Sequence, residues 1–516
     1  MDTTKQREKH AHLGLNESEA DVAVQLAVES DSLDPKEAAR LRWKIDKHIL
    51  PLMCLLYLMT FADKTTLGQS SVLGILKGAH LNQTQFNWLG SVFYLSYLVF
   101  EYPQSLALQR FPVGKWMSVN IFVWSIALIC HAACSSFGGL FAVRFILGVC
   151  EGAITPGFMI VTSMFYTREE QTQRTGYWFL MNGFAIIVLG FIAFGVLHTR
   201  TGSFMPWQWL MIITGLITLI LSVIFWFFFP DSPTTARFLT PDERVKAVQR
   251  IKVNQAGLEN KTWKHDQFIE TLKDPKIWIM VMFATISNIM NSLSNQRQLI
   301  VSQFGFSFIQ TTLIGCVDGV VESGLTCCGI LVIWLGITLA SFKPIGRGYA
   351  GALLYIIATL GALLVNLLPS SNKVGLLFSY WLSISFIAPF VIFLGWVGGL
   401  TSGHTKRITT NALVLIGYCV GNFAGPFVWK KKYQPRNHVP WTLFAACNLA
   451  SGIFLLILRF MLATENKRRD MNQHDDTYDN VYVTHVNADG TTEERKVDKA
   501  FLDLTDIQNK DFRYLL

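Results

Sequence analysis

The chain has 516 residues, of which 51% are hydrophobic, 13% aromatic and only 16% charged. Soluble proteins carry about 25% charged residues, so this is not an ordinary soluble protein. The formal net charge of +8 is typical of basic loops beside a membrane, because no stretch alternates basic and aromatic residues as a nucleic-acid-binding face does. The nine cysteines lie almost wholly in apolar runs, which indicates buried small side chains rather than disulfides or a metal site.

Twelve apolar stretches follow one another along the chain, and a helix of about 20 residues is long enough to cross a bilayer. We expect spans near residues 49–68, 86–109, 116–134, 139–165, 175–197, 207–229, 276–302, 311–340, 345–368, 374–398, 407–429 and 438–462. A polar insert divides them six and six, as in secondary transporters that are built from two repeated halves. The predicted fold is therefore an all-α membrane protein with twelve transmembrane helices in two six-helix, pseudo-symmetric bundles.

Polar segments flank and divide these bundles. We expect a cytoplasmic N-terminal tail over 1–48 with a short amphipathic helix on the membrane surface, an N-terminal bundle over 49–229, a cytoplasmic linker over 230–275, a C-terminal bundle over 276–462 and a cytoplasmic C-terminal tail over 463–516. In the linker, Thr240, Pro241 and an acidic first turn predict a helix that ends near Lys252. The C-terminal tail is polar and is expected to be disordered until something binds it.

The distribution of Lys and Arg in short loops predicts that both termini are cytoplasmic. The loops 110–115, 166–174, 341–347 and 399–407 hold two basic residues each on that side. The loops on the other side hold one or none, with one exception. That exception, KKKYQPRN over 430–437, holds four basic residues and violates the rule.

Few charged residues lie inside the predicted spans. A charge at the bilayer centre costs roughly 2.5–3.5 kcal/mol on insertion scales, so it normally faces a protein interior or a water-filled cavity. The charges are Asp63 and Lys64 in the first span, Glu101 in the second, Arg144 and Glu151 in the fourth, Arg297 in the seventh, and Asp318 and Glu322 in the eighth. This set predicts a transport pathway.

Two kinds of role are expected for these charges. A desolvated carboxylate beside an arginine can couple a proton to another ligand, and Glu151 follows Arg144 by seven residues, nearly on one helix face. Lys64 and Arg297 are the cations best placed to bind an anion, one in each half. For Asp63 and Lys64 alone, a helix end with Lys64 reaching the headgroups is an equal alternative.

The remaining charges have more than one interpretation. Glu101 is favoured as part of a charge network near a helix end, because a Tyr-Pro pair follows it. Asp318 and Glu322, four residues apart on one face, form either a second acidic site or a structural pair for Arg297.

Trp88 falls at a predicted membrane interface, where an aromatic belt explains it.

No enzyme motif is found, whether a Walker loop, HExxH or a nucleophile elbow. The chain is therefore not expected to be an enzyme, to use ATP, or to hold a cofactor or metal. The expected partners are a small organic anion, a proton and the lipid bilayer, with no nucleic acid, and the chain is expected to be a monomer.

Several stretches occur in an order that is specific to one family. They include FADKTTLGQS over 61–70, RFILGVCEGAITPGF over 144–158, MFYTREEQTQRTGYWF over 164–179, IGYCVGNFAGP over 416–426 and DLTDIQNKDFRYLL over 503–516. The first three are similar to the patterns FxDRxNxGxA, RFxLGxxEAxxxPG and WYxRxExxxR. The chain resembles the anion:cation symporter group of the major facilitator superfamily, specifically the fungal allantoate permease family, from the first span to the tail.

This resemblance implies proton-driven import of a small organic anion at the plasma membrane by alternating access. It implies that Asp63 and Glu151 are the proton sites, that Lys64 contacts the anion and that Arg144 is the charge partner. The chain departs from the family pattern where Lys64 replaces an arginine, which loses bidentate carboxylate geometry, and where Thr66 replaces an asparagine. Arg297 and the paired acids of the eighth span are also atypical.

These departures touch the expected cavity, so the substrate class stays broad: a ureide such as allantoate, a vitamin acid, a dipeptide or a sulfur compound. The candidate substrate-binding residues are Lys64, Arg297 and Thr66, and the candidate charge partners or gating residues are Arg144, Glu101, Asp318 and Glu322. Two alternatives remain open. One is a proton-driven exporter of a small metabolite, and the other is a non-transporting nutrient sensor with the same fold.

Overall fold

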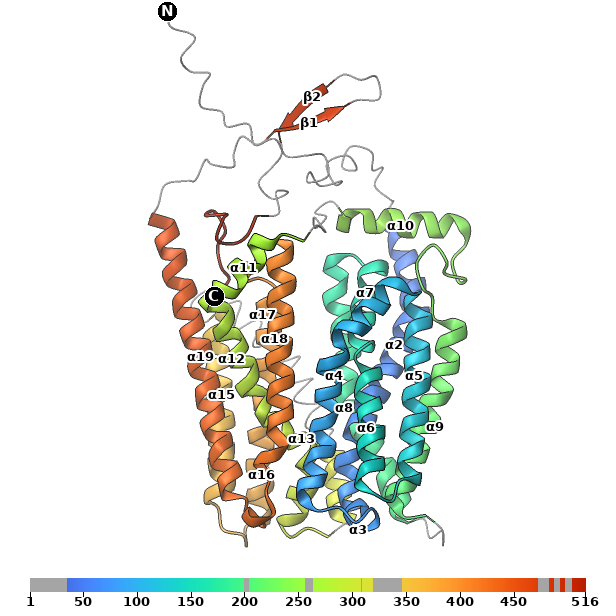
Figure 1. The fold of residues 1–516 in the computed structure, drawn as a ribbon, viewed down its shortest axis with the longest axis vertical. Coiled ribbons are helices and arrows are strands. Elements are labelled where there is room, and N and C mark those ends of the chain that lie inside the picture. The colour runs from blue at the N-terminus through green and yellow to red at the C-terminus, as the bar shows by residue number, and fades with distance from the viewer. Residues whose placement is uncertain are drawn as a thin grey trace, which may run out of the picture.

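The computed structural model describes residues 35–198, 204–255, 263–307, 309–318, 346–471, 482–486, 492–496 and 504–516. They form two helical bundles that stand side by side (Figure 1). The N-terminal half contains α2 (Pro35–Val72), α3 (Ile75–Gly78), α4 (Gln83–Arg110), α5 (Val113–Cys130), η1 (His131–Ala133), α6 (Phe137–Glu151), α7 (Ile154–Phe165), α8 (Arg168–Leu197) and α9 (Pro206–Phe228). The C-terminal half contains α12 (Pro275–Ile289), η2 (Met290–Ser292), α13 (Leu293–Gln303), a helix over 309–318, α15 (Gly346–Leu367), α16 (Lys373–Ser383), η3 (Ile384–Phe386), α17 (Ile387–Val397), α18 (His404–Ala424), η4 (Gly425–Val428), η5 (Lys431–Tyr433) and α19 (His438–Met471).

The predicted membrane-spanning architecture is confirmed. Ten of the described helical stretches are long and apolar enough to cross a membrane. Helix α4 runs the full height of the N-terminal bundle beside them although it contains Glu101 (Figure 1). The predicted eighth span, 311–340, is described only over 311–318, so most of it lies outside the described residues.

The two ends of the bundles differ. We call the end that carries α10 (Pro241–Gln255), α11 (His265–Lys273) and the C-terminal residues the linker side, and the end that carries α3 and η5 the far side (Figure 1). The first span is longer than predicted, because α2 continues from the linker side without a break. The helix expected within residues 35–48 is present, and it continues into the first span as part of α2.

Three spans are interrupted near their middle. The fourth span breaks at Gly152 and Ala153, between α6 and α7. The seventh and tenth spans each pass through a short 3-10 turn, η2 and η3. Interrupted helices free backbone groups from helical hydrogen bonds, and in transporters such breaks line the substrate cavity.

Each half packs around its own hydrophobic core. The buried apolar residues form one cluster within the N-terminal half and the adjoining linker and a second cluster within the C-terminal half. Close helix contacts depend on glycine at specific positions. A Cβ atom on Gly148 of α6 would lie 2.3 Å from the carbonyl oxygen of Phe93, so α4 and α6 could not approach as they do.

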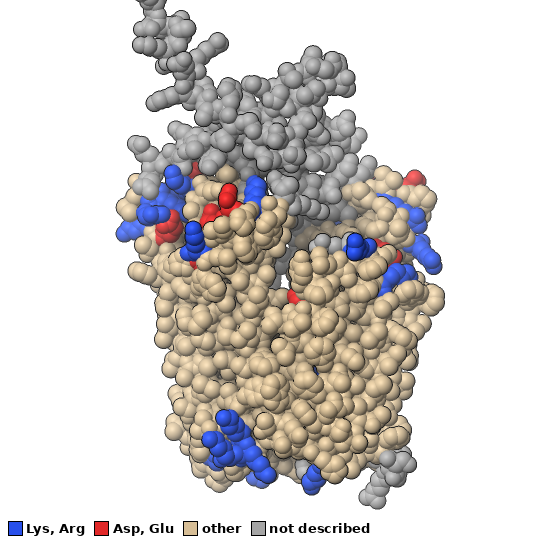
Figure 2. Space-filling model, viewed as in Figure 1, with Lys and Arg blue, Asp and Glu red and all other residues tan. Residues whose placement is uncertain are grey.

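The halves meet on the far side in a polar contact that we call the far-side seam, formed by Asn87, Ser91, Gln296, Phe423 and Trp429. The Asn87 side chain donates to the carbonyl oxygen of Trp429 at 2.7 Å and accepts from Gln296 at 2.9 Å. The Ser91 hydroxyl donates to the carbonyl oxygen of Phe423 at 2.8 Å. On the linker side a groove separates the halves, and it contains acidic surface (Figure 2). The structure is thus closed on the far side and opens toward the linker side.

The linker helix α10 begins where the sequence predicts. The Thr240 hydroxyl accepts from the amide of Glu243 at 3.3 Å, and the Glu243 carboxylate accepts from the amide of Thr240 at 2.8 Å. Lys44 of α2 also donates to Glu243, at 2.6 Å, which lowers the pKa of that carboxyl. Arg250 pairs with Glu170 at 2.6 Å. These contacts fasten α10 to the N-terminal half.

The end of the C-terminal tail is ordered, contrary to the expectation of a disordered tail. Helix α19 extends to Met471, β1 (Tyr482–Val486) and β2 (Thr492–Lys496) form an antiparallel hairpin, and residues 504–516 pack on the C-terminal half. The fully buried Asp506 pairs with Lys276 at 2.6 Å and with Lys406 at 2.9 Å. Burial alone would raise the pKa of Asp506, but the two lysines outweigh it and hold the pKa below its usual value.

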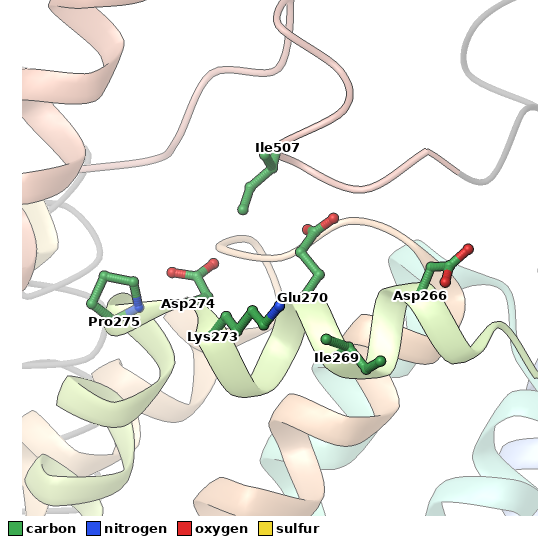
Figure 3. Close-up of a pocket in the computed structure, with 7 residues that line it drawn as sticks. All are labelled: Asp266, Ile269, Glu270, Lys273, Asp274, Pro275 and Ile507. Atoms are coloured by element: carbon green, nitrogen blue, oxygen red, sulfur yellow. The ribbon is translucent and has the colours of Figure 1, made fainter.

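A hollow of about 390 Å³ lies on the linker side between α11 and this tail (Figure 3). Its charged lining residues are Asp266, Glu270, Asp274 and Lys273, and Ile507 of the tail faces them. Lys406 pairs with Glu270 at 2.8 Å and with Asp274 at 3.0 Å, so the negative charge of this hollow is partly compensated.

Candidate functional site

The centre of the site is an ion pair between α2 and α6. Lys64 Nζ lies 2.6 Å from Glu151 Oε1. The Glu151 side chain is 5% exposed and that of Lys64 is 23% exposed, so the pair is largely withdrawn from solvent but Lys64 stays reachable. Glu151 is the last residue of α6, directly before the break in the fourth span. Lys64 therefore does not reach the headgroups, which removes that alternative.

Asp63 lies next to this pair on α2 and is 1% exposed. Its Oδ2 atom accepts a hydrogen bond from the Thr218 hydroxyl of α9 at 2.8 Å. Its Oδ1 atom has no hydrogen-bond partner among the described residues. A buried carboxylate oxygen without a donor is costly when ionised, so Asp63 is suited to hold a proton.

Arg144 lies deeper in the N-terminal bundle, at 2% exposure. Its Nη2 atom donates to the Thr66 hydroxyl at 3.3 Å, and Thr66 in turn donates to the carbonyl oxygen of Asp63 at 2.6 Å. The charge of Arg144 also interacts with those of Asp63 and Glu151. Thr66 is fully buried and bound to Arg144, so in this conformation its hydroxyl orients the arginine instead of facing an open cavity.

The structure corrects the expectation for Glu101. The Tyr-Pro pair after it does not end the helix, since α4 continues to Arg110 with Pro103 inside it. Glu101 thus lies within the bundle, where one carboxylate oxygen would be 3.8 Å from a Cβ atom on Gly152. It faces the break between α6 and α7, not a helix end.

Gln104 stabilises the same break and was missed by sequence reasoning. Its side chain donates to the carbonyl oxygen of Val149 at 2.9 Å and to Asn120 at 2.9 Å, and accepts from Trp116 at 2.9 Å. A polar amide inside an apolar span is the signal that would have found it.

In the C-terminal half, the candidate residues lie near the eighth span. Arg297 of α13 is 6% exposed, and Asp318 is 1% exposed and accepts a hydrogen bond from the Trp381 indole at 2.5 Å. Glu322 lies outside the described residues. No described hydrogen bond or ion pair joins Arg297 to the Lys64–Glu151 pair, which takes its counter-charges from the N-terminal half.

Aromatic residues surround Lys64, and sequence reasoning did not single them out. Lys64 Nζ lies 5.4 Å from the ring centre of Phe93. Tyr418 of α18 packs against the N-terminal core, and its ring centre lies 6.2 Å from that of Tyr94. Tyr418 also interacts electrostatically with Lys64, so the C-terminal half contributes a phenol near the ion pair.

Comparison with known proteins identifies the family. The Major Facilitator Superfamily model matches residues 53–426. The allantoate permease of Saccharomyces cerevisiae is 32% identical over 505 residues, covering 96% of this chain and 90% of the permease. The chain belongs to the fungal allantoate permease family of the major facilitator superfamily.

Two further matches agree with a transporter and with its fold. The high affinity cysteine transporter of the same yeast is 29% identical over 518 residues, covering 96% of this chain and 95% of the transporter. Among solved structures, the xylose transporter from E. coli has the same fold with a TM-score of 0.58 and 12% identity, covering 80% of this chain and 97% of that chain. This major facilitator protein is therefore a multi-pass membrane transporter of small molecules.

Within the described part of this transporter, no three His, Cys, Asp or Glu side chains are arranged so that they could hold one metal ion. What the site offers is an exchangeable cation, Lys64, beside carboxylates that are nearly or fully withdrawn from water. Such an arrangement can bind an anion and a proton in the same place.

Proposed function

We propose that this transporter imports a small organic anion together with protons across the plasma membrane, from the far side to the linker side, with both termini in the cytoplasm. The observation that carries the proposal is the 2.6 Å contact between Lys64 and Glu151. The exposed fraction of Lys64, at 23%, leaves its ammonium open to a competing anion.

Coupling follows from competition for Lys64. A substrate carboxylate that pairs with Lys64 displaces Glu151 from its cation. A buried carboxylate without a counter-charge is costly to keep ionised, so Glu151 binds a proton as the substrate binds. Release of the substrate lets Glu151 lose the proton and return to Lys64, which resets the site.

Asp63 and Arg144 support this exchange. Asp63 has one oxygen without a described partner, so it is a second place for a proton. Arg144, which is 2% exposed, interacts with the charges of both acids. Arg144 therefore lowers the free energy of the state in which both Asp63 and Glu151 are ionised.

Alternating access requires the far-side seam to open. The seam is made of neutral hydrogen bonds, which exchange for water at a modest net cost of about 0.5–1.5 kcal/mol each. A substrate that pairs with Lys64 next to the phenol of Tyr418 contacts both halves, and such contacts can favour their closure on the linker side.

The test is uptake into proteoliposomes of known sidedness, with radiolabelled allantoate and cysteine as first probes because relatives are named for them. Glu151→Gln keeps the shape of the side chain but cannot exchange a proton. We expect it to lose accumulation driven by a pH gradient and to keep counterflow of the same probe.

Glu37→Gln, at an exposed ion pair of α2, is the control and should transport normally. If Glu151→Gln still responds fully to the gradient, the coupling role is wrong, and accumulation on the opposite side would identify an exporter.

A further inference from the structure

The described part of the far side carries only basic charged residues. The described far-side segments 73–82, 131–136, 304–307, 368–373 and 429–437 contain no Asp or Glu. Their charged residues are Lys77, Lys373, Lys430, Lys431, Lys432 and Arg436. Basic side chains gather at the far-side edge of the C-terminal half, and on the face shown in Figure 2 acidic surface occurs only toward the linker side and in the groove.

We propose that Lys430, Lys431 and Lys432 form an electrostatic collecting patch that concentrates small anions, and rejects cations, at the far-side entrance. This inference deepens the proposed function, since it concerns how an anion reaches Lys64. It also gives a role to the one loop that violates the distribution of basic residues between the two sides of the membrane.

The loop that carries the patch is held in place by residues other than these lysines. The Asn437 side chain donates to Gln303 Oε1 at 2.6 Å, and Arg436 Nη2 donates to the carbonyl oxygen of Leu368 at 2.6 Å. Lys430, Lys431 and Lys432 themselves are exposed. Arg436 is thus structural, whereas the three lysines present their ammonium groups to solvent from a fixed backbone.

The patch lies at the seam where the halves meet. Trp429, whose carbonyl oxygen accepts from Asn87, directly precedes Lys430. On the other side of the patch, the Gln434 side chain donates to Gln83 Oε1 of α4 at 3.4 Å. An anion drawn to these lysines is therefore beside the contact that must open to admit it.

The physical effect of such a patch depends on distance and salt. The Debye length is about 8 Å at physiological ionic strength, so the lysines act only on ions close to the seam. A surface that carries charge of a single sign raises the local concentration and the association rate of oppositely charged ligands, by factors of about ten or more at low salt. The inference therefore predicts selectivity for anions over cations that weakens as salt is added.

The experiment measures this selectivity without a substrate. A cysteine reporter replaces Thr84, an exposed residue of α4 next to Gln83. The reaction rates of the full-length protein in phosphatidylcholine vesicles are measured with an anionic sulfonatoethyl and a cationic trimethylammonioethyl methanethiosulfonate, and the rates of the parent without the reporter are subtracted. The combined change Lys430→Gln, Lys431→Gln and Lys432→Gln is compared with Lys47→Gln, Lys273→Gln and Lys467→Gln, which removes three exposed lysines from the linker side.

We expect the anionic-to-cationic rate ratio to fall at least about threefold in the far-side triple variant at low salt and to stay unchanged in the linker-side variant. Added salt should remove the difference. An unchanged ratio in the far-side variant would overturn the inference. So would a change seen only when the vesicles contain phosphatidylserine, because the lysines would then act through bound lipid headgroups. Since no transport is measured, these outcomes are independent of the test of proton coupling.

Discussion

Lys64 Nζ lies 2.6 Å from Glu151 Oε1, and the two residues come from α2 and from the last turn of α6, before the break in the fourth span. The pair thus joins a continuous helix to an interrupted one. Because Glu151 is nearly buried, loss of either partner leaves a charge that water cannot easily compensate.

Separating the partners should destabilise the transporter more than removing both. Lys64→Met leaves Glu151 buried without its cation, which costs roughly 3–5 kcal/mol for a fully buried pair and less here because Lys64 is 23% exposed. Adding Glu151→Gln should recover much of that loss. Thermal unfolding of both single variants and the double variant in detergent gives the coupling energy.

The exposed pair between Lys246 and Glu37, at 3.0 Å, is the control for this cycle. Its coupling should be less than about 1 kcal/mol. Equal coupling energies at the two pairs would contradict the assignment of Lys64–Glu151 as a buried functional pair.

Thr218→Val should destabilise the transporter by removing a hydrogen bond to Asp63. The change keeps the volume of the side chain but removes the hydroxyl that donates to Asp63 Oδ2 at 2.8 Å. A hydrogen bond between neutral groups contributes about 0.5–1.5 kcal/mol, so with Asp63 protonated the free energy of unfolding should fall by that order. Thr464→Val, at an exposed threonine of α19, should have almost no effect. If both variants unfold alike, the Thr218 contact does not hold the carboxylate.

Gly148→Ala should force α4 and α6 apart. The new Cβ atom would lie 2.0 Å from the Ser96 hydroxyl oxygen and 2.3 Å from the carbonyl oxygen of Phe93. Overpacking of this kind costs about 1–3 kcal/mol. Gly138→Ala in the same helix meets nothing within 4 Å and is the matched control. Unfolding temperature and uptake should both fall only for Gly148→Ala, and an equal response from the control would refute the packing argument.

Asp506→Asn should release the C-terminal residues from the C-terminal half. Asp506 is fully buried between Lys276 and Lys406, so neutralising it leaves two lysines without their shared carboxylate. Carboxypeptidase digestion should then remove the C-terminal residues faster than in the parent. Asp470→Asn, which breaks only the exposed pair with Arg513, should not change the digestion rate.

The pH dependence of this docking follows from the lowered pKa of Asp506. A carboxyl whose pKa is lower in the folded state stabilises that state above its unfolded pKa of about 3.9, and the stabilisation is lost as the pH falls through the lowered value. Protection of the C terminus should therefore be constant between about pH 5 and pH 8. Loss of protection within that range would show that another group controls docking.

Figure 2 places the basic far-side edge and the acidic surface of the groove at opposite parts of the same face. Acidic side chains on the linker side lie among Lys and Arg, whereas the described far-side segments contain no Asp or Glu.

The sequence alone determined the membrane-spanning architecture, because the length and hydropathy of a span depend on local composition. It also singled out Asp63, Lys64, Arg144 and Glu151, because a charged side chain in hydrocarbon is costly and normally faces the protein interior or a water-filled cavity. The start of α10 was readable from its capping residues, which act over a few positions.

Only the tertiary structure decided which charges meet. Lys64 pairs with Glu151, Asp63 with Thr218, and these partners are distant in sequence, so spacing along one helix could not reveal them. The position of Glu101 inside the bundle and the ordering of residues 504–516 were mispredicted for the same reason. A proline within a long helix and a polar tail are stabilised by contacts with other helices, and those contacts form only when the chain has folded.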